Sequence, residues 1–286
     1  MEPGPNVNAV GRMLGVLGDE WTLLIAQQAS MGATRFSEFA ARLPISNAVL
    51  TARLRRMTVD GLLERDDRRY LLTPRGRALW PVLVSIWAWE RRWVPEHALP
   101  AIRHNGCGAD CAPTLTCGGC GEAVSEKVLD ARWGPSGSWA RSTPVSTTRR
   151  RSHGDRTGLF PQTMTILGNR WSFAVMVAAF VGTNRFTDFA EQLGAPPGSL
   201  SDRLQILVAN EVLDARYQLT EKGRAVLPIL VTALDWGQRW LVGPEGPAVD
   251  VTHTTCGSAF HAVLVCDQCG EPLRGRDIEA VAYAAD

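Results

Sequence analysis

The sequence lacks a long apolar run, a basic leader segment and a marked excess of charge of either sign. No stretch approaches the ~18 consecutive apolar residues of a membrane helix, so we expect no membrane partner. Residues 1–6 carry neither the basic nor the apolar segment of a secretory signal, which predicts a cytoplasmic protein. In that compartment the seven cysteines are not expected to form structural disulfides, and an odd number cannot pair completely.

Motifs of the common enzyme classes are also missing. We find no nucleophile–base pattern, no phosphate-binding loop and no open metal site, so an enzyme is not expected. The 286 residues, 45% of them hydrophobic and 21% charged, suffice for two globular domains. The net charge of +1 hides an uneven distribution, because residues 131–157 hold six basic and one acidic side chain while residues 158–286 hold nine and fourteen. This asymmetry predicts that the two halves do different work.

The chain contains an internal duplication. Leu17-Gly18-Asp19-Glu20-Trp21 returns as Leu167-Gly168-Asn169-Arg170-Trp171, and further matches follow in the same order. So many ordered matches indicate two copies of one module. Between the copies, residues 133–157 are rich in Gly, Ser, Thr, Pro and Arg and predict a flexible basic linker. An arm that touches DNA phosphates through Arg149-Arg150-Arg151 is the alternative.

Each copy predicts several helices, then a hairpin and a last helix. In the first copy helices are expected over 7–17, 19–29, 37–43, from Ser46 onward and over 73–93, with Asp19, Ser37, Ser46 and Thr73 as N-caps. A hairpin with a charged tip is expected over 62–72. The two middle helices have the spacing of a helix-turn-helix, and Val49, Leu50, Leu54 and Met57 form the apolar side of the second. The expected fold class is α+β and mainly helical, with two winged helix-turn-helix modules in tandem, each followed by a small zinc-knuckle-like unit.

A set of short motifs makes this pattern more specific. They are Leu17-Gly18 with Trp21-Thr22-Leu23-Leu24, Arg35-Phe36, Leu50-Thr51-x-Arg53-Leu54, Asp60-Gly61-Leu62 and Leu72-Thr73-Pro74-x-Gly76. In combination they resemble the HxlR family of bacterial winged-helix transcription regulators. The resemblance implies a DNA-binding dimer whose first and last helices form the interface, and hence a covalent pseudo-dimer here. Thiol-sensing members carry a cysteine near the start of the first helix, where this chain has Asn8 and Gly158, so that mechanism is not expected.

The DNA-reading residues are expected in the first module. Outward positions of its recognition helix are Asn47, Ala48, Thr51, Ala52 and Arg55, and Asn and Arg suit bidentate base contacts. Phosphate contacts are expected from Arg53, Arg56, Arg65, Arg68 and Arg69. In the second module Asp202 replaces Ala52, Gln205 and Ile206 replace Arg55 and Arg56, and the wing shortens to 214–217. We therefore expect a double-stranded operator to be contacted mainly by module 1.

Two Cys/His clusters have identical spacing. They are His104-x2-Cys107-x9-Cys117-x2-Cys120 and His253-x2-Cys256-x9-Cys266-x2-Cys269, with glycine after the second member of each pair. Four such ligands predict a closed, structural Zn²⁺ site in each copy, two ions per chain. Buried reduced cysteines beside a chance histidine are the alternative. Cys111 has no counterpart and is expected to be free, although it could replace His104 as a ligand.

These predictions define five segments: 1–98 as winged-helix module 1, 99–132 as knuckle 1, 133–157 as linker, 158–244 as module 2 and 245–286 as knuckle 2. A small-molecule-binding protein on the same scaffold is the alternative function. Six tryptophans of the long helices are expected in the core and interface, or else around a flat aromatic effector: Trp80, Trp87, Trp89, Trp93, Trp236 and Trp240. Pairing of whole chains into a homodimer stays open.

Overall fold

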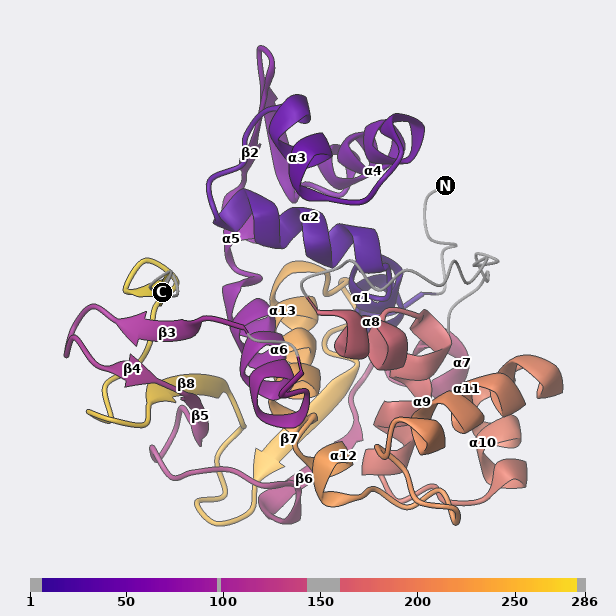
Figure 1. The fold of residues 1–286 in the computed structure, drawn as a ribbon. Coiled ribbons are helices and arrows are strands. Elements are labelled where there is room, and N and C mark those ends of the chain that lie inside the picture. Colours follow the sequence, from indigo (N-terminus) through magenta and orange to yellow (C-terminus); the bar gives the residue numbers. More distant parts are fainter. Residues whose placement is uncertain (1–6, 97–98, 143–159, 282–286) are drawn as a thin grey trace.

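The computed structural model describes residues 7–96, 99–142 and 160–281, and short antiparallel strand pairs lie beside its helices, several of them at the edge of the molecule (Figure 1). The first half contains α1 (Ala9–Leu17), α2 (Glu20–Ser30), α3 (Phe36–Arg42), α4 (Asn47–Val59), β1 (Leu63–Asp66), β2 (Arg69–Leu72), α5 (Pro74–Arg77), α6 (Trp80–Trp93), β3 (Ala101–His104), β4 (Asp110–Cys111), β5 (Pro113–Cys117), the 3-10 helix η1 (Glu126–Val128), β6 (Leu129–Trp133) and α7 (Trp139–Ser142). The second half contains α8 (Pro161–Leu167), α9 (Arg170–Phe180), α10 (Phe186–Leu193), α11 (Pro197–Ala209), α12 (Glu221–Arg224), α13 (Leu227–Trp240), β7 (Val249–His253), β8 (Ala262–Cys266) and β9 (Ile278–Val281). None of the helices in these ranges is long and apolar enough to cross a membrane.

The helix starts follow from capping side chains. Asp19 accepts a hydrogen bond from the backbone N–H of Thr22 at the start of α2, as predicted. The first helix begins at Ala9 and not at residue 7, because the Asn8 side chain is its cap. The predicted Ser37 cap is also wrong. Helix α3 begins one residue earlier, and the Glu38 carboxylate accepts the backbone N–H groups that precede it.

The single long helix predicted over 73–93 is two helices, α5 and α6. Proline at position 81 explains the break, since it has no N–H to donate and its ring clashes with the carbonyl four residues before it. Pro228 stands at the same place in the second copy, where α12 and α13 are separated in the same way.

The two halves pack against each other through equivalent, reciprocal contacts. Helices α6 and α13 lie side by side at the centre of the molecule (Figure 1), and α1 packs on α13 while α8 packs on α6. The Trp89 indole N–H donates to the Lys222 carbonyl at 3.1 Å, and its counterpart Trp236 donates to the Arg75 carbonyl at 3.0 Å. Buried side chains of both halves form one continuous hydrophobic core. The halves are therefore not independent domains.

The strands also cross between the halves. β5 pairs antiparallel with β8, β3 with β9, and β6 with β7, so that each pair takes one strand from each copy. The segments predicted as two separate knuckle units, 99–132 and 245–286, are thus interleaved. Part of the predicted linker is ordered as well: Trp133 ends β6, and α7 is fixed to the start of α1 by a hydrogen bond from Asn8 to the Ser142 hydroxyl. Residues 143–159, with Arg149-Arg150-Arg151, lie outside the described residues.

Candidate functional site

Helix α4 presents the side that was predicted to face DNA. Leu50, Leu54 and Met57 are buried against the module. The five predicted outward positions are all exposed, namely Asn47, Ala48, Thr51, Ala52 and Arg55. Val49, which was predicted on the apolar side, is 39% exposed, so the apolar stripe is narrower than expected. The outer face of α4 consequently carries mostly small side chains, with the polar Asn47 and Thr51 and one long cation among them, as close approach to base edges requires.

The predicted phosphate-contacting arginines fall into two groups. Arg53 forms an ion pair with Asp19 at 2.9 Å, and Arg56 forms one with Asp60 at 2.8 Å. These two guanidinium groups already have a carboxylate partner within the module. In the wing, Arg69 pairs with Asp66 and Arg65 donates to the Asp67 carbonyl.

Two exposed arginines remain available. Within the described ranges, the side chains of Arg55 on α4 and of Arg68 at the tip of the β1–β2 hairpin form neither a hydrogen bond nor an ion pair with the protein. Asp67 beside Arg68 has a φ of 52°, the left-handed conformation that a tight hairpin tip requires. The structure therefore separates Arg55 and Arg68, which are free to meet a ligand, from Arg53 and Arg56, which hold the module together.

The equivalent surface of the second half differs in shape and charge. On α11, Asp202 is exposed where the first half has Ala52, and Gln205 lies near the Ser201 hydroxyl where the first half has Arg55. The wing is a single bridge between Leu213 and Leu219 in place of a two-stranded hairpin. As predicted, this head is less basic and has a shorter wing.

The Cys/His residues gather in two clusters, but not in the predicted grouping. One cluster contains His104 and Cys107 of the first copy with Cys266 and Cys269 of the second. The other contains Cys117 and Cys120 of the first copy with His253 and Cys256 of the second. Each cluster thus spans the two halves, and the prediction of one complete site per copy is wrong.

The register of β5 and β8 explains the exchange. In each copy the His-x2-Cys pair precedes a five-residue strand and the Cys-x2-Cys pair follows it, and such a strand separates its ends by roughly 14 Å. Because Pro113 pairs with Cys266 and Cys117 with Ala262, the end of one strand lies beside the start of the other. The antiparallel pairing therefore brings each Cys-x2-Cys pair to the His-x2-Cys pair of the other copy.

The distances within the clusters suit a tetrahedral metal ion. Zinc bound at about 2.3 Å from sulfur and 2.05 Å from nitrogen requires S···S separations near 3.8 Å and S···N separations near 3.6 Å. Cys107 and Cys266 have Sγ atoms 3.9 Å apart, and the Cys117 and Cys256 Sγ atoms are 4.0 Å apart. The His Nδ1 atoms lie 3.3–3.4 Å from their cysteine neighbours. These S···S distances also exclude a disulfide, whose bond length is about 2.05 Å.

The surroundings of Cys256, a ligand candidate, and of Cys111 shift the pKa of the two thiols in opposite directions. Hydrogen bonds from the Ser258 backbone and then from His253 lower the pKa of Cys256 to about 6, which favours the thiolate that binds metals. Burial, and then the neighbouring Cys266, raises the pKa of Cys111 to about 12. Cys111 lies beside Cys266 and Asp267, whereas His104 completes the four-residue cluster. The expectation that Cys111 is not a ligand of that cluster agrees with this arrangement.

The six tryptophans named from the sequence do not surround one pocket. Trp89 and Trp236 are buried at the interface of α6 and α13. Trp80 and Trp87 line a cavity of about 400 Å³ beside α2. A larger cavity of about 480 Å³ lies beside α9 and is lined by Trp133 and Trp139, which sequence reasoning had assigned to the linker. No sequence signal pointed to it, because its walls come from segments of both copies.

Comparison with known proteins gives matches to both halves. The family described as HxlR-like helix-turn-helix matches residues 16–98 and 166–244, together more than half of the chain. An uncharacterized HTH-type transcriptional regulator of Mycobacterium tuberculosis is 33% identical over 144 residues, covering 47% of this chain and 89% of the relative. The uncharacterized HTH-type transcriptional regulator YvaP of Bacillus subtilis is 35% identical over 91 residues, covering 29% and 84%. The solved structure of PA1607, a candidate transcription factor, has 40% identity, covers 29% of this chain and 62% of that one, and gives a TM-score of 0.27.

Proposed function

Since the chain belongs to the HxlR-like helix-turn-helix family, whose members are transcriptional regulators and not enzymes, we propose that it binds an operator in duplex DNA as a covalent pseudo-dimer. In this proposal the first half makes the main DNA contact, and two Zn²⁺ ions join the halves. The observation that carries the proposal is the exposed face of α4 with Asn47 and Thr51, together with the side chains of Arg55 and of Arg68 at the wing tip, which have no internal partner.

The reciprocal packing of the halves supports the pseudo-dimer. The contacts of α6 with α13, and of α1 and α8 with the opposite long helix, are those that two identical subunits related by a two-fold axis would make. The mycobacterial relative agrees with this view, because its match covers most of its own length but only about half of this chain. Such a relative is thus little more than half as long as this chain, as one subunit of the corresponding dimer would be.

Differences in charge support DNA contact through the first half. Between Arg35 and Arg77 there are ten basic and five acidic residues, against five and six between Arg185 and Arg224. Nonspecific affinity for DNA comes mainly from cations near phosphates, and acidic side chains oppose it. The exposed Asp202 on α11 therefore weakens the second head, which serves the pseudo-dimer chiefly by holding the first.

The metal proposal rests on the two Cys/His clusters. Each offers three cysteine sulfurs and one histidine Nδ1 within 4.8 Å of one another, which is a complete tetrahedral set. Four protein ligands leave no position for a substrate, so the proposed role is structural. Because every cluster takes two ligands from each copy, the ions would act as two cross-links between the halves.

Fluorescence anisotropy with DNA from upstream of the protein's own coding region tests DNA binding. Arg55→Ala is expected to weaken specific binding by ~1–3 kcal/mol, and Arg68→Ala to lower the salt slope by about one unit. Gln205→Ala, at the position equivalent to Arg55, is the matched control and is expected to leave both quantities unchanged. Equal losses from Arg55→Ala and Gln205→Ala in folded proteins would disprove unequal heads, and full affinity in Arg55→Ala and Arg68→Ala would disprove DNA contact through this surface.

Arg53→Ala and Arg203→Ala are the second pair of variants. The sequence alone predicts a loss of DNA contact for Arg53→Ala and little change for Arg203→Ala. The ion pair with Asp19 now gives Arg53 a second role in fixing α4 to α2. Thermal unfolding must therefore accompany the binding measurement for this pair.

A further inference from the structure

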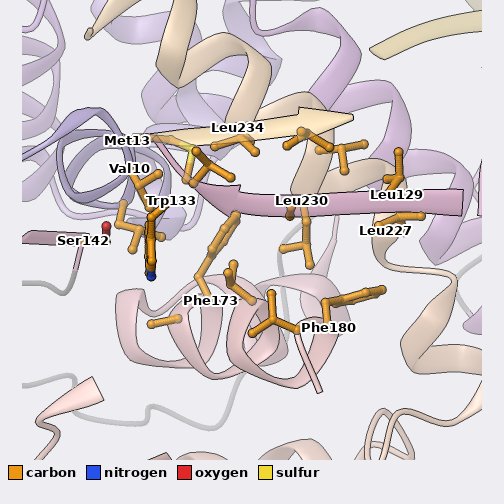
Figure 2. Close-up of a pocket in the computed structure, with 18 of the residues that line it drawn as sticks. Val10, Met13, Leu129, Trp133, Ser142, Phe173, Phe180, Leu227, Leu230 and Leu234 are labelled. Atoms are coloured by element: carbon orange, nitrogen blue, oxygen red, sulfur yellow. The ribbon is translucent and has the colours of Figure 1, made fainter. Parts of the chain in front are cut away.

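The larger cavity is walled by elements of both copies. Helix α9 forms one side, and the β6–β7 strand pair with α13 forms the other, while α1 and α7 close one end. Figure 2 shows Phe173 pointing from α9 toward the strands, with Phe180 farther along the same helix and Leu227 and Leu230 of α13 nearby. Trp133 and Val181 at the margin are 42% and 53% exposed, so the cavity communicates with solvent. Its volume of about 480 Å³ is that of a small-molecule site.

Apart from the indole N–H groups of Trp133 and Trp139, the lining side chains offer no free charge and no free hydrogen-bonding group. Only three of the lining residues are polar, and each has a partner inside the protein. Glu126 is paired with Arg224, Arg132 with Asp130, and the Ser142 hydroxyl with Asn8. A charged ligand would lose its hydration without compensation, whereas an uncharged apolar one loses little.

The aromatic side chains define the ligand further. Trp133 and Trp139 meet edge to face, with ring centroids 5.2 Å apart, and Phe173 and Phe180 add two more rings to the wall. Aromatic rings interact best with other rings through such offset and edge-to-face geometries. From volume, polarity and ring content together, we propose that this cavity is a binding site for an uncharged aromatic small molecule.

The duplication provides a comparison within the same molecule. The smaller cavity of about 400 Å³ occupies the equivalent place beside α2, and its lining differs at matched positions. There Trp87 stands where the larger cavity has Leu234, and it packs edge to face on Phe160. Gln27 stands where the larger cavity has Val177, and both polar atoms of its buried amide have no hydrogen-bond partner. The apolar, open character of the larger cavity is therefore a property of its side chains and is not imposed by the fold.

A small molecule suits the cavity better than a segment of the chain does. Residues 143–159 follow Ser142 at its edge, but their composition is dominated by polar and basic residues, including Arg149-Arg150-Arg151. Such a sequence offers little apolar surface to bury. The proposal does not depend on DNA reading by the first half, since the cavity uses none of the residues of α4 or the wing.

Titration of the full-length protein with N-phenyl-1-naphthylamine tests the proposal. This uncharged aromatic probe fluoresces strongly in apolar surroundings, and saturable binding at one site per chain is expected. Leu234→Trp copies the side chain of the smaller cavity into the larger one and is expected to raise the Kd at least about tenfold. Val177→Gln places an unpaired amide in the wall with little added volume, and is expected to raise the Kd by a smaller factor.

Met31→Trp is the matched control. Met31 and Val181 are equivalent residues at the margins of the two cavities, and Met31 is 49% exposed, so its replacement is not expected to disturb the fold. Binding to this variant should equal that of the wild type. If a thermal melt shows that Leu234→Trp is not folded, the Kd of the Val177→Gln variant for the probe is the test of the proposal. The proposal is overturned if the wild type shows no saturable binding, if the folded cavity variants bind like the wild type, or if Met31→Trp loses binding equally.

Discussion

The exchange of ligands between the copies can be tested by counting metal ions in paired variants. In the structure Cys107 and Cys269 belong to one cluster, whereas Cys107 and Cys120 belong to different clusters. Cys107→Ser combined with Cys269→Ser should therefore damage one site and leave one zinc ion per chain. Cys107→Ser combined with Cys120→Ser should damage both sites. One site per copy, as the sequence spacing suggests, gives the opposite result for the two pairs.

The size of the effect follows from the number of ligands. A structural zinc site contributes about 10–16 kcal/mol at neutral pH, so one of four ligands accounts for roughly 3 kcal/mol. That loss corresponds to a decrease in affinity of about a hundredfold. The Cys107/Cys269 pair removes two ligands from the same cluster, and the remaining His104 and Cys266 should not retain zinc against a chelator. The Cys107/Cys120 pair leaves three ligands in each cluster, so both ions should exchange readily with the chelator.

The assay is zinc release to a colorimetric chelator, followed by metal analysis of the protein that remains. We expect two tightly bound ions in the wild type, one in the Cys107/Cys269 variant and none in the Cys107/Cys120 variant. Cys111→Ser is the control, because Cys111 lies outside both four-residue clusters, and it should retain two. One tight ion in the Cys107/Cys120 variant and none in the Cys107/Cys269 variant would refute the crossed grouping. A folded wild type without metal would refute the zinc proposal itself.

Two further predictions concern the packing and the pH dependence of the modules. Gly237→Ala should destabilise the protein by ~1–3 kcal/mol through overpacking, because a Cβ there would lie 2.9 Å from the Cβ of Met13. Gly15→Ala lies on the exposed side of α1, where a Cβ has no atom within 4 Å, and should stabilise the protein by ~0.5–1 kcal/mol. Urea unfolding that ranks the two variants the other way would contradict the α1–α13 packing. Hydrogen bonds from the Thr34 and then the Arg35 backbone lower the pKa of Glu38 below its ordinary value. The ionised Glu38 therefore contributes its full stabilisation of the fold at pH values above the ordinary pKa. That stabilisation is lost as the pH falls through the lowered pKa of the folded protein. Unfolding of Glu38→Gln should consequently depend less on pH in the acid range than that of the wild type, and identical acid profiles would show that this cap does not act.

Local chemistry was predictable wherever a residue acts on its neighbours in the chain. The Asp19, Ser46 and Thr73 caps and the hairpin with its charged tip all lie at the predicted places. These features depend on hydrogen bonds between residues three or four positions apart, and the residue types at those positions predict them directly. The break before α6 was not predicted, although its cause, Pro81, is equally local.

Features that depend on contacts between the two copies could not be predicted from the sequence. The spacing of His104, Cys107, Cys117 and Cys120 fits a site within one copy, and only the pairing of β5 with β8 excludes that arrangement. The Arg53–Asp19 ion pair likewise joins residues far apart in the sequence, so a side chain assigned to phosphate turned out to have an internal partner. The periodicity of apolar residues along the chain does not indicate which distant segments come into contact.

The packing of the long helices shows why two fused copies differ from a dimer of either one. In this chain the buried Glu90 carboxylate accepts the backbone N–H of Thr163, which is free because Thr163 lies in the first turn of α8. The equivalent contact on the other side pairs Gly237 with Met13, in the middle of α1, where the glycine makes room for the methionine.

Pairing two first halves would place Glu90 against Met13, burying a carboxylate beside a thioether and a backbone N–H already bonded within α1. Pairing two second halves would place Gly237 against Thr163, leaving both a void and an unsatisfied N–H. Each half therefore fits the other better than it fits itself, and this preference arises from both attraction in the observed pair and mismatch in the alternatives. The heads and the cavities beside them differ between the halves as well, as Arg55 and Gln205, and Gln27 and Val177, show.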